Sequence, residues 1–213
     1  PMKIARHPEE RMNKNALIRV VDDDEALLKA IKFSLELDGF SVATYGSAEA
    51  FLENDDLERS GCIILDYQMP GLNGIEVQRL LSEQEIILPI IFLTAHADVN
   101  MVIGAFKGGA FDFLRKPVVP ELLTQAIEKA VEENEQTLEK LRESAPEKRY
   151  EHLSEQQKQV AKLIARNLTS SVIGERLGKS RRTIERHRAN VLHLLGVSTP
   201  SELKDFLMAI NKF

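Results

Sequence analysis

Hydrophobic and polar positions alternate between two patterns along residues 16–128. Short runs of consecutive apolar residues are typical of strands that are covered on both faces of a parallel sheet. These runs occupy residues 16–22, 40–45, 61–66, 88–94 and 110–116. Between them, apolar residues recur at helical spacing, at residues 25–39, 47–54, 74–85 and 99–109, and a long helix begins near Pro120. The alternation predicts an α/β doubly wound five-stranded parallel sheet with right-handed crossovers.

Four short helical patterns fill residues 151–213, without any strand-like run among them. Three of the helices start behind a serine, a residue type that caps helix N-termini. The expected caps are Ser154, either Ser170 or Ser171, and Ser180. Gly178 lies between the second helix and the third, where it is expected to end the second. Two helices joined by a tight glycine-containing turn are typical of a helix-turn-helix, so we predict a small all-α helix-turn-helix domain.

The helix predicted over residues 180–195 carries apolar side chains on one face and charged side chains on the other. The apolar stripe, expected to pack inward, is Ile184, Val191 and Leu195. The outward face is Arg182, Glu185, Arg186 and Ala189, and the basic residues around it are Lys179, Arg181, Arg182, Arg186 and Arg188. This density of positive charge suits DNA phosphates, and the alternative is an ordinary solvated helix face. His187 either contacts a phosphate or packs within the domain.

A helical segment joins the two regions. No Gly or Pro interrupts residues 121–145, and at ~1.5 Å per residue a helix from Pro120 to Ser144 spans roughly 37 Å. Its apolar residues recur at spacings of three and four around one polar position: Ile127, Val131, Asn134, Leu138 and Leu141. The seam predicts either a short coiled coil in a dimer, with Asn134 fixing the register, or a solvated helix without a partner. Pro146 is expected to end the helix.

Composition and charge follow the same division. The expected parts are an N-terminal tail (1–16), an α/β domain (17–128), a helical linker (129–150) and a helix-turn-helix domain (151–213). Residues 151–213 hold eleven Lys and Arg against six Asp and Glu, a net charge of +5, whereas the whole chain carries −5. A basic second domain favours nucleic acid as its partner. No apolar run reaches the ~18 residues of a membrane span, no secretory segment follows the N-terminus, and Cys62 is the single cysteine, so we expect a cytoplasmic location.

Polar side chains end four of the predicted strands, at the edge where such sheets bind ligands. They are Asp22, Asp23 and Asp24 after the first strand, then Asp66, Thr94 and Lys116. Clustered carboxylates repel one another unless a cation joins them, and oxygen ligands with room for water suit Mg²⁺. Mg²⁺ beside an ammonium and a hydroxyl makes a place for a phosphoryl group. Singly, Asp24 is an ordinary helix N-cap and Asp66 a turn former, but the coincidence at four strand ends favours a site.

These strand ends lie in four motifs, VVDDDE, ILDYQMPGLNG, FLTAHAD and GAFDFLRKPV. With them, residues 17–128 resemble the receiver domain of bacterial two-component response regulators, a domain with a flavodoxin-like fold. The resemblance implies that Asp66 is the phosphoacceptor, held at the solvent edge of its strand as a nucleophile. The MPG turn that follows leads the chain away and leaves room for a phosphate donor.

The resemblance also implies roles for the residues around Asp66. The metal ion, Mg²⁺ or Mn²⁺, would be held directly by Asp23, Asp66 and the backbone carbonyl of Gln68, and through water by Asp22. Phosphoryl oxygens would be held by Thr94 and Lys116, and Phe113 stands where the family keeps its switch aromatic. By position alone, Gln68 and His96 are candidates for setting the lifetime of the phosphoryl group.

The second domain resembles the LuxR-type helix-turn-helix, through LSEQQKQV, IGERLGKSRRTIERHR and LLGVSTPSEL. The domain order and the details DDDE and MPG resemble the FixJ-like branch of response regulators. The expected DNA-binding residues are Lys179, Arg181, Arg182, Glu185, Arg186, His187, Arg188 and Ala189. The family usually has Arg-Glu at Gln156 and Gln157, a Gly near Asn167, and Asn-Lys at Ser170 and Ser171. The absent lysine removes one expected phosphate contact.

Together these features predict a phosphorylation-activated transcriptional regulator, whose only enzymatic steps are phosphorylation and dephosphorylation of Asp66. Its expected partners are a sensor histidine kinase, promoter DNA and a second copy of the chain in a phosphorylation-dependent homodimer, with RNA polymerase a further candidate and no membrane partner. A Mg²⁺-dependent phosphohydrolase with an Asp nucleophile is the alternative, but it would need a second acid–base Asp where Gln68 stands. A protein-binding adaptor is a third hypothesis, which salt-dependent DNA binding would distinguish.

Overall fold

The computed structural model describes residues 16–213 except residues 56, 58, 85 and 96–98. The expected tail, apart from Ala16, and His96 therefore lie outside the described residues. The chain separates into two compact units. The first holds the sheet and ends at Asn134, and the second holds Leu80–Ile87 and the residues from Glu135 onward. Within the described part of the chain, every helix is too short or too polar to span a membrane.

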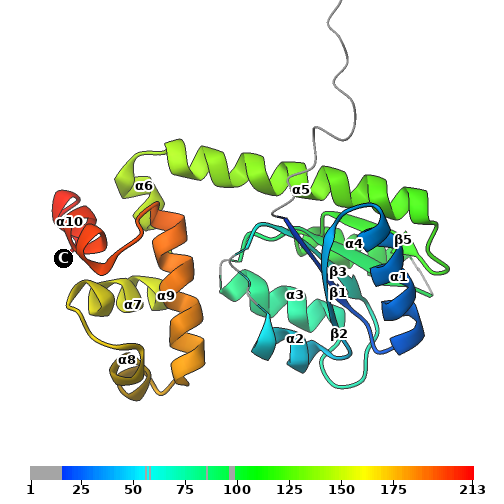
Figure 1. Ribbon diagram of the computed structural model, residues 1–213, viewed down its shortest axis with the longest axis horizontal. Helices are drawn as coiled ribbons and strands as arrows, with labels where there is room; N and C mark the ends of the chain where they lie inside the picture. Colours follow the sequence, from blue (N-terminus) through cyan, green and yellow to red (C-terminus); the bar gives the residue numbers. More distant parts are fainter. Residues whose placement is uncertain (1–15, 56, 58, 85, 96–98) are drawn as a thin grey trace, which may run out of the picture. The chain divides into compact units, whose positions relative to one another are not determined.

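The first unit is built on a five-stranded parallel sheet with the strand order β2-β1-β3-β4-β5 (Figure 1). The strands are β1 (Leu17–Val21), β2 (Ser41–Tyr45), β3 (Gly61–Asp66), β4 (Ile90–Thr94) and β5 (Asp112–Arg115). The winding direction reverses between β1 and β3, so the carboxyl ends of these strands flank the point at which doubly wound sheets bind ligands. The predicted fold class is confirmed.

Helices connect the strands and cover both faces of the sheet. They are α1 (Glu25–Leu37), α2 (Ala48–Asn54), α3 (Gly74–Glu83), α4 (Val99–Lys107) and α5 (Pro120–Glu143). One core joins strand residues such as Ile64 and Ile91 to Ile31 of α1 and Ile127 of α5. Phe92, next to Ile91, points to the opposite face, where the start of α3 lies against it. This double coverage explains why β3 and β4 are buried along their whole length and lack polar alternation.

The long helix α5 remains packed on the first unit beyond residue 128. Val131 belongs to the core shared with α1, and Asn134 is only 2 % exposed. The Asn134 side-chain oxygen accepts a hydrogen bond from the backbone N–H of Gly61 at 3.1 Å, which satisfies a buried donor at the start of β3. This contact contradicts the role of Asn134 as a register-fixing residue of a coiled coil, because the same side chain cannot face a partner helix.

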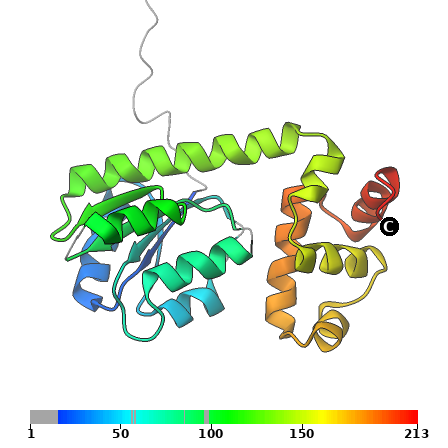
Figure 2. The ribbon, with the colours of Figure 1, turned by 180° about the vertical axis from the view of Figure 1, so that it is seen from behind.

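The second unit contains five further helices (Figure 2). They are α6 (Pro146–Glu151), α7 (Glu155–Ala165), α8 (Ser170–Leu177), α9 (Arg181–Leu195) and α10 (Pro200–Ala209). Pro146 follows the end of α5, as predicted, but it also opens α6, because proline is tolerated in the first turn of a helix. Ser154 caps α7 in a reciprocal capping box with Gln157.

The turn between α8 and α9 has the predicted helix-turn-helix form. Gly178 adopts a left-handed conformation at φ +63°, which ends α8, and Ser180 caps α9. Thr169, rather than Ser170 or Ser171, caps α8 by accepting a hydrogen bond from the N–H of Val172. The predicted inward stripe of α9 is fully buried in the core of this unit: Ile184, Val191 and Leu195.

Candidate functional site

Three carboxylates converge at the carboxyl edge of the sheet. Val21 and Leu65 are partners in the parallel β1–β3 pairing, so the residues that follow them, Asp22 and Asp66, become neighbours. Ligand oxygens of Asp22, Asp23 and Asp66 all lie within 4.8 Å of one another. Asp22 and Asp66 are buried, whereas Asp23 is exposed, so the cluster has one side open to solvent.

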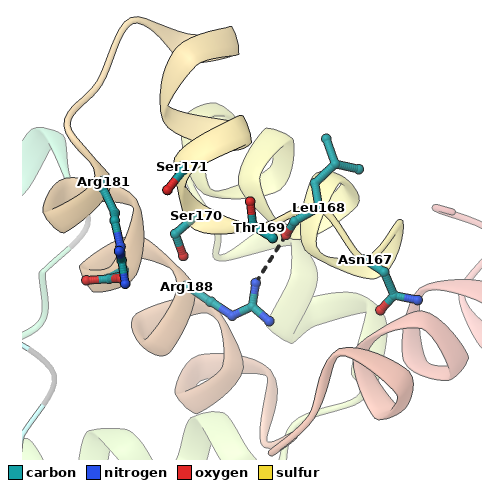
Figure 3. A pocket seen from close by; sticks show the side chains of 8 residues that line it. Asn167, Leu168, Thr169, Ser170, Ser171, Arg181 and Arg188 are labelled. Carbon is teal, nitrogen blue, oxygen red and sulfur yellow. Dashed lines mark hydrogen bonds and ion pairs between the residues drawn. The ribbon is translucent and has the colours of Figure 1, made fainter.

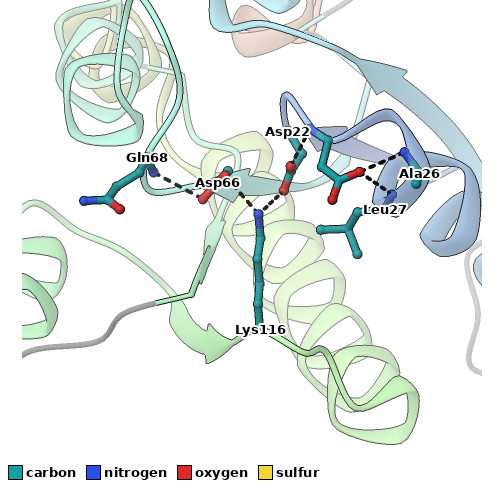
Figure 4. A network of polar contacts seen from close by, with 7 residues as sticks. Asp22, Ala26, Leu27, Asp66, Gln68 and Lys116 are labelled. Atoms are coloured by element: carbon teal, nitrogen blue, oxygen red, sulfur yellow. Dashed lines mark hydrogen bonds and ion pairs between the residues drawn. The ribbon is translucent and has the colours of Figure 1, made fainter.

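Lys116, from the end of β5, lies between two of these carboxylates (Figure 4). Its Nζ is 2.6 Å from Oδ2 of Asp22 and 2.9 Å from Oδ2 of Asp66. The backbone N–H of Lys116 donates to the carbonyl of Thr94 at 2.7 Å, which holds the end of β5 beside β4. The ammonium therefore sits where it can neutralise charge that accumulates on Asp66.

The electrostatics of the site follow from burial and from this ion pair. Burial raises the pKa of the Asp22 carboxyl above its ordinary value, and the Lys116 ammonium only partly offsets that effect. Burial alone would lower the pKa of Lys116, but hydrogen bonds to Asp22 and Asp66 reverse the sign and raise it. Lys116 is therefore a cation at neutral pH.

Asp24 has the ordinary role that its position predicts. Its side chain accepts hydrogen bonds from the N–H groups of Ala26 at 2.9 Å and Leu27 at 3.1 Å, which caps α1 (Figure 4). The N–H of Asp24 itself donates to Oδ1 of Asp22 at 3.0 Å. The cap therefore also orients one carboxylate of the cluster.

The donor set fits a hard divalent cation. Carboxylate oxygens are the ligands that Mg²⁺ prefers, and the exposed side of Asp23 leaves room for the water ligands that Mg²⁺ retains. The backbone N–H of Gln68 donates to Oδ1 of Asp66 at 3.2 Å, so the chain turns closely around that carboxylate immediately after β3. Asp22, Asp23 and Asp66 are the residues that could hold the ion.

Thr94 and Phe113 occupy the neighbouring strands. Thr94 ends β4 and is 1 % exposed. The ring of Phe113 on β5 is half-buried and packs against Tyr67 at 6.0 Å and Phe92 at 6.1 Å between ring centroids. Tyr67 directly follows Asp66, so the aromatic cluster adjoins the acidic one.

The start of α3 makes a close approach to the backbone of Asp66. A Cβ atom on Gly74 would lie 2.5 Å from the carbonyl oxygen of Asp66 and 2.8 Å from the ring of Phe92. The N–H of Gly74 donates to the carbonyl of Tyr67 at 3.1 Å and closes the loop. Only glycine fits at this position without displacing the end of β3.

Two groups of neighbouring residues could not be predicted from the sequence. Glu49 on α2 accepts a hydrogen bond from the N–H of Leu72, in the loop that follows Asp66, at 3.2 Å. The turn residues PGLNG reveal the loop, but no sequence pattern links it to Glu49 on a different helix.

The second group is a buried ion pair between β1 and Asp55. Arg19 is fully buried in β1, and its Nε donates to Oδ1 of Asp55 at 2.6 Å. The hydroxyl of Tyr45 donates to Oδ2 of Asp55 at 2.6 Å, and the Tyr45 carbonyl accepts from the N–H of Asp22 at 3.1 Å. A single arginine inside the apolar run LIRVV was the only signal in the sequence.

In the second unit, α9 presents the predicted basic face. Arg182, Glu185 and Ala189 are exposed and Arg186 is half-exposed. His187 is only 7 % exposed, and burial, reinforced by Arg186 and Lys179, lowers its pKa to about 4. His187 is therefore neutral at pH 7, and the packing alternative describes it better than a cationic contact to phosphate.

A pocket of about 520 Å³ adjoins this helix (Figure 3). It is lined by the turn before α8, by the first residues of α8 and by charged residues of α9: Asn167, Leu168, Thr169, Ser170, Ser171, Arg181, Glu185 and Arg188. Arg181 pairs with Glu185 at 2.7 Å, and Arg188 donates to the Leu168 carbonyl at 3.5 Å. The pocket therefore combines two guanidinium groups and hydroxyls with the Glu185 carboxylate, which already pairs with Arg181.

Comparisons with known proteins match both units. Residues 18–128 match the family described as the response regulator receiver domain, and residues 151–207 match the bacterial regulatory proteins of the luxR family. The response regulator protein TodT of Pseudomonas putida is 35% identical over 199 residues, which cover 93% of this chain and 86% of TodT. The transcriptional regulatory protein FixJ of Rhizobium meliloti is 36% identical and covers 82% of this chain and 86% of its own length.

Solved structures agree with these relatives. Full-length FixJ from B. japonicum has a TM-score of 0.55 and 34% identity, covering 93% of this chain and 98% of its own. The response regulator StyR also has a TM-score of 0.55, with 33% identity, covering 92% of this chain and 99% of its own. This chain belongs to the response regulators of two-component systems, with a receiver domain followed by a LuxR-type DNA-binding domain.

Proposed function

We propose that this response regulator is a transcriptional regulator activated by phosphorylation of Asp66. The observation that carries the proposal is the convergence of Asp22, Asp23, Asp66 and Lys116 at one sheet edge, in a chain that also carries a LuxR-type DNA-binding domain. A carboxylate held between a divalent-cation site and a cationic lysine can act as a nucleophile toward phosphorus.

The chemistry is the transfer of a phosphoryl group to a carboxylate oxygen of Asp66. That oxygen forms a bond to phosphorus, and the bond from phosphorus to the donor nitrogen of a sensor-kinase histidine breaks. The electron pair of the broken bond remains on the imidazole. Lys116 stays protonated and stabilises the negative charge on the transferred group, and the hydroxyl of Thr94 donates a hydrogen bond to it.

The proposed cofactor is Mg²⁺ or Mn²⁺, held by Asp23, Asp66 and the Gln68 carbonyl, with Asp22 bound through water. When bound, the ion neutralises charge on the phosphoryl oxygens. Before the ion arrives, the Lys116 ammonium offsets part of the negative charge at the acidic edge, because it pairs with both Asp22 and Asp66.

Phosphorylation is proposed to act on the second unit by changing the face around β5. The new charge on Asp66 draws in the Thr94 hydroxyl, and Phe113 follows. The contacts of Phe113 with Tyr67 and Phe92 give the ring a defined resting position from which to move. The outcome is a phosphorylation-dependent homodimer that places two copies of α9 on adjacent half-sites of promoter DNA.

The outward face of α9 is proposed to enter the major groove. Arg186 is central on that face and can pair with a guanine edge, and Glu185 can accept from a cytosine amine. Arg182 and Ala189 complete this face, and Lys179 lies just before the helix as a further DNA-binding residue. The flanking Arg181 and Arg188 hold phosphates from the pocket described above. RNA polymerase is a further proposed partner, and the cytoplasm the proposed location.

The test is phosphorylation by a small phosphodonor, acetyl phosphate, with and without Mg²⁺. Wild-type protein is expected to gain an acid-labile phosphoryl group only with the metal ion. Asp66→Asn keeps the shape of the side chain and removes the nucleophile, so it should gain none. If the Asn variant is phosphorylated at the wild-type rate, Asp66 is not the acceptor.

A further inference from the structure

The loop between β3 and α3 carries Gln68, whose backbone carbonyl is a proposed ligand of the metal ion. At its start, the N–H of Tyr67 donates to the carbonyl of Leu93 at 2.8 Å, and at its end Gly74 donates back to Tyr67 at 3.1 Å. Gln68 is also tied to Oδ1 of Asp66. These contacts fix the two ends of the loop where they meet, but they do not reach its outer part, Pro70 to Leu72.

A contact from α2 holds that outer part. Oε1 of Glu49 accepts the N–H of Leu72 at 3.2 Å. Gly71, one residue earlier, has φ +77°, and a Cβ atom there would lie 2.6 Å from the same Oε1. The Glu49 carboxylate can approach the loop this closely because Gly71 has no side chain. Gly71 also adopts a backbone conformation that L residues rarely adopt.

Contacts at the start of α2 orient the Glu49 side chain toward the loop. Its carboxyl lies over the first turn of α2, where Ser47 caps the helix. Hydrogen bonds from the N–H of Glu49 itself and from the N–H of Leu72 hold the pKa of the carboxyl below its ordinary value. The carboxylate is therefore ionised across the pH range in which a Mg²⁺ site of carboxylates works, and its oxygens remain free of protons to accept from the loop.

We infer that Glu49 is a positioning residue for metal binding: through Leu72 and Gly71 it holds the loop that presents the Gln68 carbonyl, although Glu49 touches neither the ion nor the phosphoryl group. This inference rests on the proposed function, because it assigns a supporting residue to the same site. Its consequence is that α2, which contributes no ligand, affects the affinity for Mg²⁺ and leaves the phosphoryl-transfer step itself unchanged.

The experiment compares four full-length proteins: wild type, Glu49→Ala, Glu49→Gln and Glu53→Ala. Glu53 is an exposed glutamate of the same helix and serves as the matched control. Mg²⁺ alone is titrated into each protein by calorimetry. The initial rate of phosphorylation by acetyl phosphate is then measured across Mg²⁺ concentrations, so that the Mg²⁺ requirement is separated from the rate at saturation.

Glu49→Ala is expected to weaken Mg²⁺ binding about three- to tenfold, the range for loss of one hydrogen bond of ordinary net strength. Its phosphorylation rate at saturating Mg²⁺ should return to the wild-type value. Glu49→Gln keeps an oxygen acceptor for Leu72 and should stay within about twofold of wild type, as should Glu53→Ala.

Two results overturn the inference while wild-type protein still shows Mg²⁺-dependent phosphorylation. One is a Glu49→Ala variant that binds Mg²⁺ as tightly as Glu53→Ala, even if its melting temperature falls, since Glu49 would then only support α2. The other is a Glu49→Gln variant as weak as Glu49→Ala, since negative charge rather than loop contact would then be responsible. Absence of Mg²⁺-dependent phosphorylation in wild type overturns the proposed function and this inference together.

Discussion

Replacing Gly74 with alanine should disturb the phosphoacceptor directly, although Gly74 is eight residues away from it in the sequence. The new Cβ would lie 2.5 Å from the Asp66 carbonyl oxygen, 2.8 Å from the Phe92 ring and 3.1 Å from Cα of Tyr67. Two of these three neighbours are backbone atoms of β3 and the loop after it, so they cannot rotate away as a flexible side chain would. The end of β3 must shift instead.

The size of the effect follows from these distances. Forcing an extra methyl group into a packed site costs roughly 1–3 kcal/mol. A helical Gly→Ala exchange without a clash has the opposite sign and stabilises by roughly 0.5–1 kcal/mol. Among the described residues, nothing outside its own helix would lie within 4 Å of a Cβ atom on Gly104 in α4. Gly104→Ala is therefore the matched control and should be neutral or stabilising.

Hydrogen exchange followed by mass spectrometry measures both changes in the first unit alone. The amides of β3 report the free energy of opening of the sheet without a contribution from the second unit. Gly74→Ala should speed their exchange and slow phosphorylation by acetyl phosphate, whereas Gly104→Ala should do neither. If Gly74→Ala exchanges and phosphorylates like wild type, the close approach of α3 to Asp66 is not a feature of the protein in solution.

Three further predictions concern the metal and DNA sites. Asp23→Ala should weaken Mg²⁺ binding in a titration, while Asp24→Ala, which loses only a helix cap, should mainly lower stability by ~0.5–2 kcal/mol; the reverse pattern would refute the assignment of the acidic cluster. Burial raises the folded-state pKa of Asp22, so ionisation of this carboxyl lowers the stability of the folded protein as pH rises through that pKa. Without Mg²⁺, Asp22→Asn should therefore melt at a higher temperature than wild type at pH 7, and this difference should disappear in acid. Equal melting temperatures at pH 7 would contradict this. Arg186→Ala should lose roughly 1–3 kcal/mol on the specific operator and little on scrambled DNA, whereas Arg181→Ala should weaken both alike and flatten the salt dependence; equal losses for Arg186→Ala on both duplexes would make it a phosphate contact.

Much of the fold could be predicted from local patterns in the sequence. The apolar run of β3 needs two covered faces, which only a parallel sheet between helices supplies. Helix starts could be predicted from their N-cap residues, because each cap accepts a hydrogen bond from a backbone N–H only two or three residues away. These caps are Asp24, Ser154 and Ser180. Asp22 and Asp66 could be placed together since strand ends in such a sheet share one edge.

Contacts between distant segments could not be predicted in this way. Asn134 lies in a heptad-like seam, yet its amide oxygen meets the N–H of Gly61, 73 residues away. The spacing of apolar residues along the helix predicts that one helix face is buried. It does not say whether a sheet of the same chain or a partner helix covers that face. The contact of Glu49 with Leu72 is likewise between distant segments. The place of Glu49 in the first turn of α2 says nothing of a loop that follows 23 residues later.

The central claim is that phosphorylation of Asp66 controls DNA binding, and a salt series of binding to a genomic operator fragment tests it most directly. The fragment is chosen as the DNA that wild-type protein enriches from its genome in the presence of acetyl phosphate and Mg²⁺. Wild-type protein should bind this fragment more tightly with the phosphodonor than without it, and Asp66→Asn should show the weaker affinity under both conditions. Equal affinity of wild-type protein with and without phosphodonor, under conditions in which Asp66 is shown to be phosphorylated, would contradict the account.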